Sequence, residues 1–285
     1  MCTSRWTSSF FLLAGLAFGV STSVDAQAVR SGFDSSVFTA TSCGAGCTPG
    51  SSAVDDGSMG PLGLGFTVDF FGTDYSSVWL NVNGNLTLTG ALLTYTPFAI
   101  TGGSTPMFAP FFADVDTRVG SPVRFGAGAV GSRGAWGATW SDVCFYSTDC
   151  SLTNTFQVVL IDRSDIAAGD FDIEFNYDRI QWETGDASGG TGGLGGTSAH
   201  AGWTNGVGDF YELTGSGVSG AFLDSNGSAG LIYNSLNSNV DGRYVFNVRS
   251  GRVVSVPEPE SALLLLTGLF GIAGVARGRR RRPEA

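Results

Sequence analysis

The sequence predicts an all-β protein: an antiparallel β-sandwich-like single domain, with an N-terminal signal helix and a C-terminal transmembrane helix. Three observations lead to this prediction. Short apolar–polar alternations separated by turn residues recur from about residue 62 to residue 249. No apolar stripe with a 3.6-residue period and helical length lies between them. Two longer apolar runs lie near the chain ends, where export and anchoring signals are found.

Composition sets the outer limits of function. The 285 residues have room for one domain of about 230 residues plus end segments, or for two small domains. With 42% apolar residues the chain is expected to fold. All 15 basic residues are arginine, and the formal net charge is -10. Because binding a polyanion needs a spread of cations, nucleic acid is excluded as a partner.

Residues 1–26 have the three parts of a secretory signal peptide. Arg5 precedes the apolar run 10–20, and small residues end at Ala26. Cleavage is expected after Ala26, with Ala28 as the other option. An uncleaved anchor helix is less favoured, because the run is about eleven residues long and a membrane span needs roughly twenty.

The segment that follows, residues 27–60, is rich in Ser, Gly and Asp and is interpreted as a lead-in strand and loop. The next strong signal is a hairpin in residues 77–88, where alternating residues turn at Asn83-Gly84, a pair that tolerates positive φ at both turn positions. The β-branched run 154–161 is typical of a central strand.

Two further alternations predict strands in the second half of the chain. Apolar residues alternate from Phe171 to Tyr177, and the phase then slips by one residue, so that Ile180 and Trp182 take the apolar positions. A one-residue slip predicts a bulge near Asp178. The glycine-rich stretch 185–196 is expected to be a flexible loop, and the last alternation predicts a strand that includes Tyr244, Phe246 and Val248.

The C-terminal residues 251–285 contain the second apolar run. The letters VPEPE precede apolar residues 261–276, and five arginines follow between Arg277 and Arg282. Apolar residues followed by cations predict a short transmembrane helix with its arginines in the cytoplasm and the body outside. Between the two end signals, residues 27–260 carry a net charge of about -14, a surface that repels anionic polymers and can attract divalent cations.

This tripartite tail resembles the PEP-CTERM sorting signal, carried here by Pro257, Glu258 and Pro259. The resemblance implies handling by an exosortase, a membrane-embedded transpeptidase that cuts near the motif and releases or re-attaches the body at the envelope. It also implies a bacterium that makes exopolysaccharide and biofilm. The alternative is an ordinary single-pass anchor that is never cut.

The cysteines agree with export. Without Cys2, which leaves with the signal peptide, four remain, and an even count in an exported chain indicates disulfides. Three pairings are possible, and the two local ones, Cys43 with Cys47 and Cys144 with Cys150, are favoured because each spans a short loop. Zinc is disfavoured, because the spacings are not CxxC and the chain has a single histidine, His200, in a Gly/Ser-rich stretch.

Several blocks in order resemble the nidogen-like (NIDO) domain over residues 61–249, and we expect a domain at 61–250. They are DFFG at 69–72, Asn83-Gly84, APFFADVDTR at 109–118, NTFQVVLIDR at 154–163, FNYDRIQWETG at 175–185 and AGW at 201–203. The resemblance implies an extracellular module that acts in cell-matrix adhesion. Because no EGF-like companion is found, partners that such modules recognise elsewhere are not carried over.

Metal and catalytic candidates are few. Asp114 and Asp116 point to one side of an extended strand and can supply oxygen ligands for calcium, although capping a turn and pairing with Arg118 or Arg124 is the favoured explanation. An EF-hand at residues 237–242 is disfavoured, because Val248 stands at the twelfth position. No metal site or cofactor is therefore predicted, and calcium stays open.

An enzyme is not expected. His200, the single candidate imidazole base, has no evident orienting carboxylate in the sequence. Exposed tryptophans can stack on sugar rings, but core positions are favoured for all four candidates, which are Trp136, Trp140, Trp182 and Trp203.

The leading hypothesis is an exported, exosortase-sorted surface or matrix protein that acts in adhesion or in biofilm and exopolysaccharide association. The alternative is a carbohydrate-binding or carbohydrate-cleaving β module. Expected partners are the exosortase, a matrix protein or exopolysaccharide, and the membrane through the C-terminal helix before processing. The expected location is an inner-membrane intermediate, then the envelope surface or the extracellular space.

Overall fold

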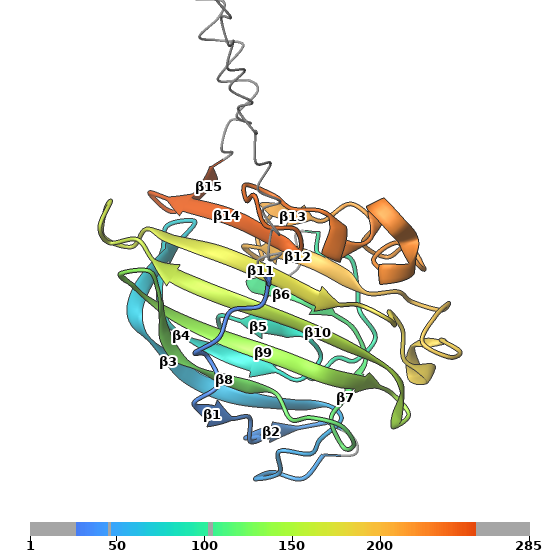
Figure 1. Ribbon diagram of the computed structural model, residues 1–285. Coiled ribbons are helices and arrows are strands. Elements are labelled where there is room, and N and C mark those ends of the chain that lie inside the picture. Colours follow the sequence, from blue (N-terminus) through green and yellow to red (C-terminus); the bar gives the residue numbers. More distant parts are fainter. Residues whose placement is uncertain (1–26, 45–46, 102–104, 255–285) are drawn as a thin grey trace, which may run out of the picture.

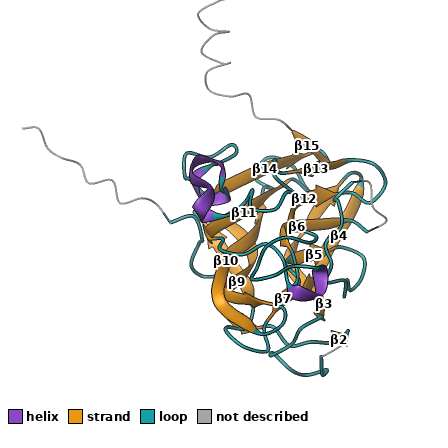
Figure 2. Cartoon of the chain, turned by 90° about the vertical axis from the view of Figure 1, so that its right-hand side faces the viewer, coloured by secondary structure: helices purple, strands orange, loops and turns teal. Residues whose placement is uncertain are grey.

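A computed structural model describes residues 27–44, 47–101 and 105–254 (Figure 1). Their strands form two antiparallel sheets that pack face to face, as the view in Figure 2 shows. The predicted all-β, sandwich-like architecture is thereby confirmed. The predicted signal helix and the transmembrane helix at 261–276 lie outside the described residues. In the part of the chain that is described, no helix has the length and hydrophobicity needed to cross a membrane.

The first sheet contains eight of the described strands, in the order β1-β8-β9-β10-β11-β14-β15, with β7 paired to β9. Every neighbouring pair is antiparallel. The bounds are β1 Ser36–Val37, β7 Val115–Asp116, β8 Arg124–Val130, β9 Arg133–Phe145, β10 Asp149–Asp162, β11 Phe171–Arg179, β14 Arg243–Arg249 and β15 Arg252–Val254.

The second sheet contains seven described strands in the order β13-β12-β6-β5-β4-β3-β2, again antiparallel at each pair. The bounds are β2 Ser42–Cys43, β3 Gly57–Phe70, β4 Thr73–Asn81, β5 Asn85–Thr87, β6 Met107–Phe112, β12 His200–Thr204 and β13 Phe210–Glu212. Short 3-10 turns, η1 Asp186–Ser188, η2 Asp224–Ala229 and η3 Leu231–Tyr233, interrupt the loops.

The core lies between the sheets and is rich in aromatic rings. Trp140 of β9 stacks on Phe156 of β10 with ring centroids 5.0 Å apart, and its indole nitrogen donates to the carbonyl of Val82 at 2.8 Å. The indole therefore fills space between the layers and also satisfies a buried carbonyl in the loop that joins β4 to β5 of the other sheet. β14 follows its predicted alternation, with Tyr244, Phe246 and Val248 buried.

The predicted central strand and bulge are both present. β10 lies between β9 and β11, in the middle of its sheet. Thr155 pairs with Arg179 and Phe156 pairs with Tyr177, so that Asp178 is the extra residue of a bulge in β11. Beyond the bulge Ile180 and Trp182 are buried, as the slipped pattern predicts.

The predicted hairpin joins β4 to β5, but its turn differs from the expected one. Asn81 pairs with Asn85, so the loop has three residues, and Gly84 with φ +78° has positive φ whereas Asn83 does not. The reason is that the Asn83 side chain turns inward and is hydrogen-bonded on both its nitrogen and its oxygen. Gly84 cannot carry a side chain, since a Cβ there would lie 1.7 Å from the carbonyl oxygen of Phe111.

The segment from Gln27 to Gly32 crosses the outer face of the first sheet, as the dark blue trace in Figure 1 shows. Arg30 exchanges backbone hydrogen bonds with the side chain of Gln157 at 3.0 and 2.8 Å, and its guanidinium pairs with Glu174 at 2.6 Å. Polar residues on this face of β11 are thus buried although they alternate with core residues, namely Asp172, Glu174 and Asn176.

Candidate functional site

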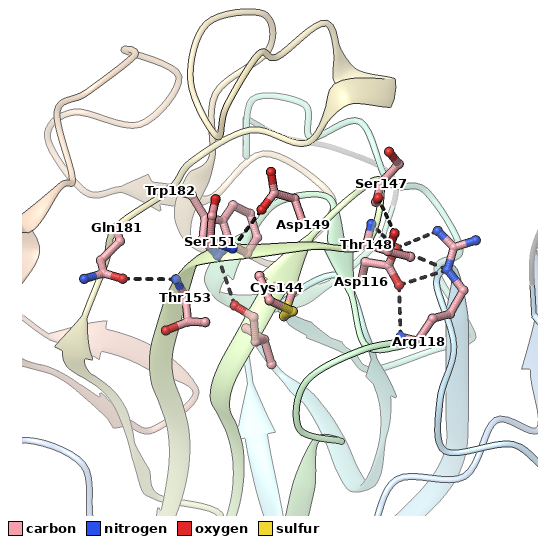
Figure 3. Close-up of a disulfide and its surroundings, with 12 residues drawn as sticks. Asp116, Arg118, Cys144, Ser147, Thr148, Asp149, Ser151, Thr153, Gln181 and Trp182 are labelled. Carbon is pink, nitrogen blue, oxygen red and sulfur yellow. Dashed lines mark hydrogen bonds and ion pairs between the residues drawn. A yellow bond between two sulfur atoms is a disulfide. The ribbon is translucent and has the colours of Figure 1, made fainter.

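Disulfides close two loops near one end of the sandwich. Both local pairs favoured by the sequence are present, Cys43–Cys47 and Cys144–Cys150. The second lies in the β9–β10 hairpin close to Asp116 (Figure 3). Gly120 passes so close to this disulfide that a Cβ would lie 2.7 Å from Sγ of Cys144.

Three buried carboxylates meet at the same end of the molecule. One oxygen from each of Asp55, Asp56 and Asp114 lies within 4.8 Å of the other two. Asp55 and Asp56 immediately precede β3, and Asp114 lies in the bend between β6 and β7. Hydrogen bonds bring the two segments together, because Val54 N donates to Thr117 Oγ1 at 3.1 Å and Thr117 N donates to Val54 O at 2.9 Å.

Asp116 does not join this group but follows the explanation that the sequence favoured. It accepts three hydrogen bonds from the Arg118 guanidinium, two from Nε at 3.0 and 3.2 Å and one from Nη2 at 2.6 Å, and a fourth at 2.9 Å from the Arg118 backbone. The backbone N–H of Thr148 donates to Oδ2 of Asp116 at 3.0 Å, the same oxygen that accepts from Arg118 Nη2 (Figure 3). Arg124 is not its partner and contacts the carbonyl of Asp34.

Asn83 connects the hairpin to the carboxylates. Its Nδ2 donates to Asp56 Oδ1 at 2.9 Å, and its Oδ1 accepts the backbone N–H of Val115 at 3.0 Å. The sequence singled out Asn83 only as a turn residue and did not single out Asp55 or Asp56 at all. The signal that was present, two adjacent acids just before a strand, is common in loops and is not specific.

Burial and mutual repulsion govern the ionisation of the cluster. Burial, followed by the charge of Asp116, raises the pKa of Asp55 to about 7. Burial, followed by the charge of Asp56, raises the pKa of Asp114 to about 7. The pKa of Asp56 is also raised by burial, although its hydrogen bond from Asn83 opposes the shift. The pKa of Arg118 is raised above its usual value by the hydrogen bond to Asp116.

Two oxygens of the cluster are buried without a hydrogen-bond partner, Oδ1 of Asp55 and Oδ1 of Asp114. The other oxygen of Asp55 lies 3.3 Å from Arg118, and that of Asp114 accepts from Ser188 Oγ at 3.3 Å. Carboxylate oxygens that accept no hydrogen bond are free to bind a hard divalent cation, which prefers oxygen ligands.

A surface cavity gives access to these groups. Its volume is about 540 Å³, and one of its walls is Asp56. Tyr95 and Thr96 also line it, and the Thr96 hydroxyl lies 3.2 Å from Ser188 Oγ. The cavity is therefore lined by one carboxylate of the cluster, Asp56, and by Thr96, which contacts the serine that donates to Asp114.

Comparison with known proteins assigns part of the chain to a family. The family model described as "Nidogen-like domain" matches residues 125–250. The part of the chain that resembles a nidogen-like domain is therefore residues 125–250. The match runs from β8 through β14, whereas the resemblance in the sequence begins at residue 61 and so includes β3 to β7.

Curated relatives agree with this assignment. Human alpha-tectorin is 31% identical over 222 residues, which cover 68% of this chain and 10% of alpha-tectorin. Chicken alpha-tectorin is 31% identical over 243 residues, which cover 76% of this chain and 11% of that protein. Drosophila melanogaster nidogen is 28% identical over 193 residues, covering 58% of this chain and 14% of nidogen. The chain thus spans about a tenth of the length of alpha-tectorin. No solved structure gives a significant match.

His200 of the nidogen-like domain is placed differently from the prediction. It begins strand β12 instead of lying in a loop, and its Nδ1 is 2.7 Å from Glu212 Oε1, so an orienting carboxylate does exist. That same oxygen also accepts the backbone N–H of Ile100 at 2.6 Å. The other side of the imidazole packs on Gly217, where a Cβ would lie 3.0 Å from Nε2. In the described residues no hydroxyl or thiol is hydrogen-bonded to the ring, so a catalytic triad is not assembled.

The four tryptophans considered as sugar platforms are all in the core, each 6% exposed or less. A different part of the nidogen-like domain offers aromatic and polar groups together. A cavity of about 400 Å³ between β13 and the η2–η3 region is lined by Tyr211, Tyr244, Asn226 and Ser235, among others. The sorting residues Pro257, Glu258 and Pro259 lie outside the described residues.

Proposed function

We propose that the protein is an exported, exosortase-sorted surface or extracellular-matrix protein whose nidogen-like domain acts in cell-matrix adhesion or in biofilm and exopolysaccharide association. The observation that carries the proposal is homology to extracellular matrix proteins, alpha-tectorin and nidogen. The two disulfides are consistent with an oxidising, extracellular location.

The contacts of the first described residues support signal-peptide cleavage after Ala26. The carbonyls of Gln27 and Ala28 accept hydrogen bonds from Arg243 at 3.3 and 2.8 Å, and the Gln27 side chain donates to Asp178 at 2.6 Å. Cleavage after Ala26 leaves these contacts intact. Cleavage after Ala28 would remove them, together with a buried alanine.

Sorting at the envelope is compatible with the fold. β15, the last described strand, ends at Val254 and pairs with β14 at the edge of the first sheet. A cut at or after Pro257 therefore removes none of the described strands. In this proposal the body is held at the inner membrane by the predicted transmembrane segment 261–276 and is then released or re-attached at the cell surface.

A binding role fits the chemistry better than an enzymatic one. Homology is to matrix proteins, and the imidazole of His200 is held by Glu212 and packed on glycine. Partners would be a matrix protein or exopolysaccharide, contacted through loops on an acidic surface. Because like charges repel, an anionic polysaccharide would need a bridging cation.

The experiment that tests this proposal compares the producing cells with and without exosortase. Intact protein is recovered from the membrane, envelope and medium fractions, and both termini are sequenced by mass spectrometry. The proposal expects Gln27 as the first residue and loss of the Arg279 to Arg282 tail when exosortase is present. A mature protein that keeps this tail in both strains would overturn the sorting step, and loss of cell–matrix attachment on deletion of the gene tests adhesion.

A carbohydrate-binding module is the second candidate, and the cavity beside Tyr211 favours it. The Tyr211 ring is partly exposed there, and Asn226 and Ser235 supply hydrogen-bonding groups. Aromatic stacking combined with a few polar contacts is how sugar-sized ligands are held. A glycan array distinguishes this role from protein adhesion. Release of reducing sugar, abolished by mutation of one acid pair, would instead indicate a carbohydrate-cleaving enzyme.

A further inference from the structure

We propose that Asp55, Asp56 and Asp114 bind a calcium ion, which joins the segment before β3 to the bend between β6 and β7. The proposal is independent of the matrix role and of sorting. It rests on the meeting of the three carboxylates, on two buried oxygens that lack hydrogen-bond partners, and on the cavity that reaches the cluster.

The unpartnered oxygens are the observation that points to a ligand. Asp55 is 5% exposed and Asp114 is 1% exposed, yet Oδ1 of each accepts no hydrogen bond. A buried acceptor without a partner is rare in folded proteins, because it gives up its hydrogen bonds to water. Asp55 and Asp114 each place one carboxylate oxygen within 4.8 Å of the other, so a single ion can contact both residues.

The local charges also call for a cation. Asp55, Asp56, Asp114 and Asp116 are all buried, and Arg118 is the cation that pairs with two of them, Asp55 and Asp116. Asp56 and Asp114 have polar but uncharged partners in the structure, Asn83 and Ser188. A divalent cation would compensate the remaining charge, since buried ions persist when they are paired or coordinate a metal.

The donor types select calcium among common divalent ions. The cluster offers oxygens alone, whereas zinc sites in proteins use cysteine and histidine. Calcium accepts irregular arrangements of six to eight oxygens, but magnesium requires a near-ideal octahedron. Extracellular calcium modules bind with Kd of about 10⁻⁴ to 10⁻³ M, which suits an exported protein.

Glycines let the surrounding loops close on the carboxylates. A Cβ on Gly185 would lie 2.6 Å from Asp114 Oδ2, and a Cβ on Gly44 would lie 2.7 Å from Asp56 Cβ. Gly44 follows Cys43 of the first disulfide, and Gly185 precedes η1. The ion would therefore bind where four segments of the chain converge, and its binding should stabilise their mutual packing.

The test uses the full chain in detergent micelles after removal of divalent ions with a chelator. Calcium chloride is titrated by calorimetry and by thermal unfolding. A calcium concentration one hundred times the Kd should raise the melting temperature by about 5 to 10 °C. Asp55→Asn and Asp114→Asn should weaken calcium affinity at least about tenfold, and Asp74→Asn, which alters an exposed carboxylate on β4, should leave it unchanged.

A measurement on the unaltered protein guards against variants that fail to fold. Terbium, which occupies calcium sites, should give luminescence when aromatic rings are excited, since Tyr95 lines the cavity next to Asp56. Calcium should quench this signal by displacement. No binding heat, no rise in melting temperature and no terbium signal would overturn the proposal, as would an Asp114→Asn variant that binds calcium as tightly as the natural sequence.

Discussion

Asn83 donates through Nδ2 to Asp56 Oδ1 at 2.9 Å, across 27 residues of sequence. The same amide accepts the backbone N–H of Val115, and it therefore positions both segments that carry the carboxylates. We predict that Asn83→Ala lowers the free energy of unfolding by about 1 to 3 kcal/mol, because it leaves buried polar groups unpaired. Asn226→Ala removes an exposed donor to the Ala221 carbonyl, and it should change the free energy of unfolding by less than about 0.5 kcal/mol. Urea unfolding measures both, and equal losses would contradict the prediction.

Gly84 should be irreplaceable in the β4–β5 hairpin. Its φ is +78°, and a Cβ would lie 1.7 Å from the Phe111 carbonyl oxygen. Gly72 has a similar φ of +82° but nothing within 4 Å of the Cβ position. A substitution at Gly72 therefore measures the cost of positive φ alone, without a steric clash. We expect Gly72→Ala to lose about 1 to 2 kcal/mol of stability, and Gly84→Ala to lose several more or to fail to fold. Similar unfolding midpoints for the two variants would rule out the close backbone approach.

Glu183 is a buried carboxylate that holds the loop before η2. It accepts hydrogen bonds from Ser198 Oγ at 2.7 Å and from the backbone N–H groups of Gly220 and Phe222 at 2.6 Å each. Glu183→Gln places an N–H₂ group against these donors, and we expect a loss of about 2 to 3 kcal/mol. Hydrogen exchange of the Gly220 and Phe222 amides should accelerate more than exchange in β10. Unchanged protection of these two amides would contradict the assigned role.

The two disulfides should stabilise the fold to a similar extent, because each closes a short loop. Sequence separations of 4 and 6 residues predict about 2 kcal/mol from each. Replacing Cys43 and Cys47 by serine, or Cys144 and Cys150 by serine, should lower the unfolding free energy by about that amount. Peptide mapping without reduction checks the pairing itself: a peptide that links Cys47 to Cys144 would exclude the local arrangement.

Part of the fold was predictable because buried and exposed side chains alternate along a β-strand, which gives the sequence an apolar–polar period of two residues. The slip after Tyr177 located the bulge at Asp178, and the alternation around Phe246 identified β14. The candidate site was not predictable in the same way. Asp114 and Asp116 are two residues apart, and a single extended strand would place them on one side. In the structure Asp114 lies in a bend, where it meets Asp55 and Asp56 from a distant segment, while Asp116 lies on β7 and pairs with Arg118.

The sequence by itself determined the all-β class, the alternating strands and the short loops that the cysteines close, because these depend on neighbours along the chain. Export and sorting signals were also predicted from local patterns, and they remain predictions. The tertiary structure alone decided which polar residues are buried, as Glu174 beneath Arg30 and Asp56 beside Asn83 illustrate. Contacts between segments far apart in sequence have no local period, so only the packing of the two sheets reveals where carboxylate oxygens are buried without a hydrogen-bond partner.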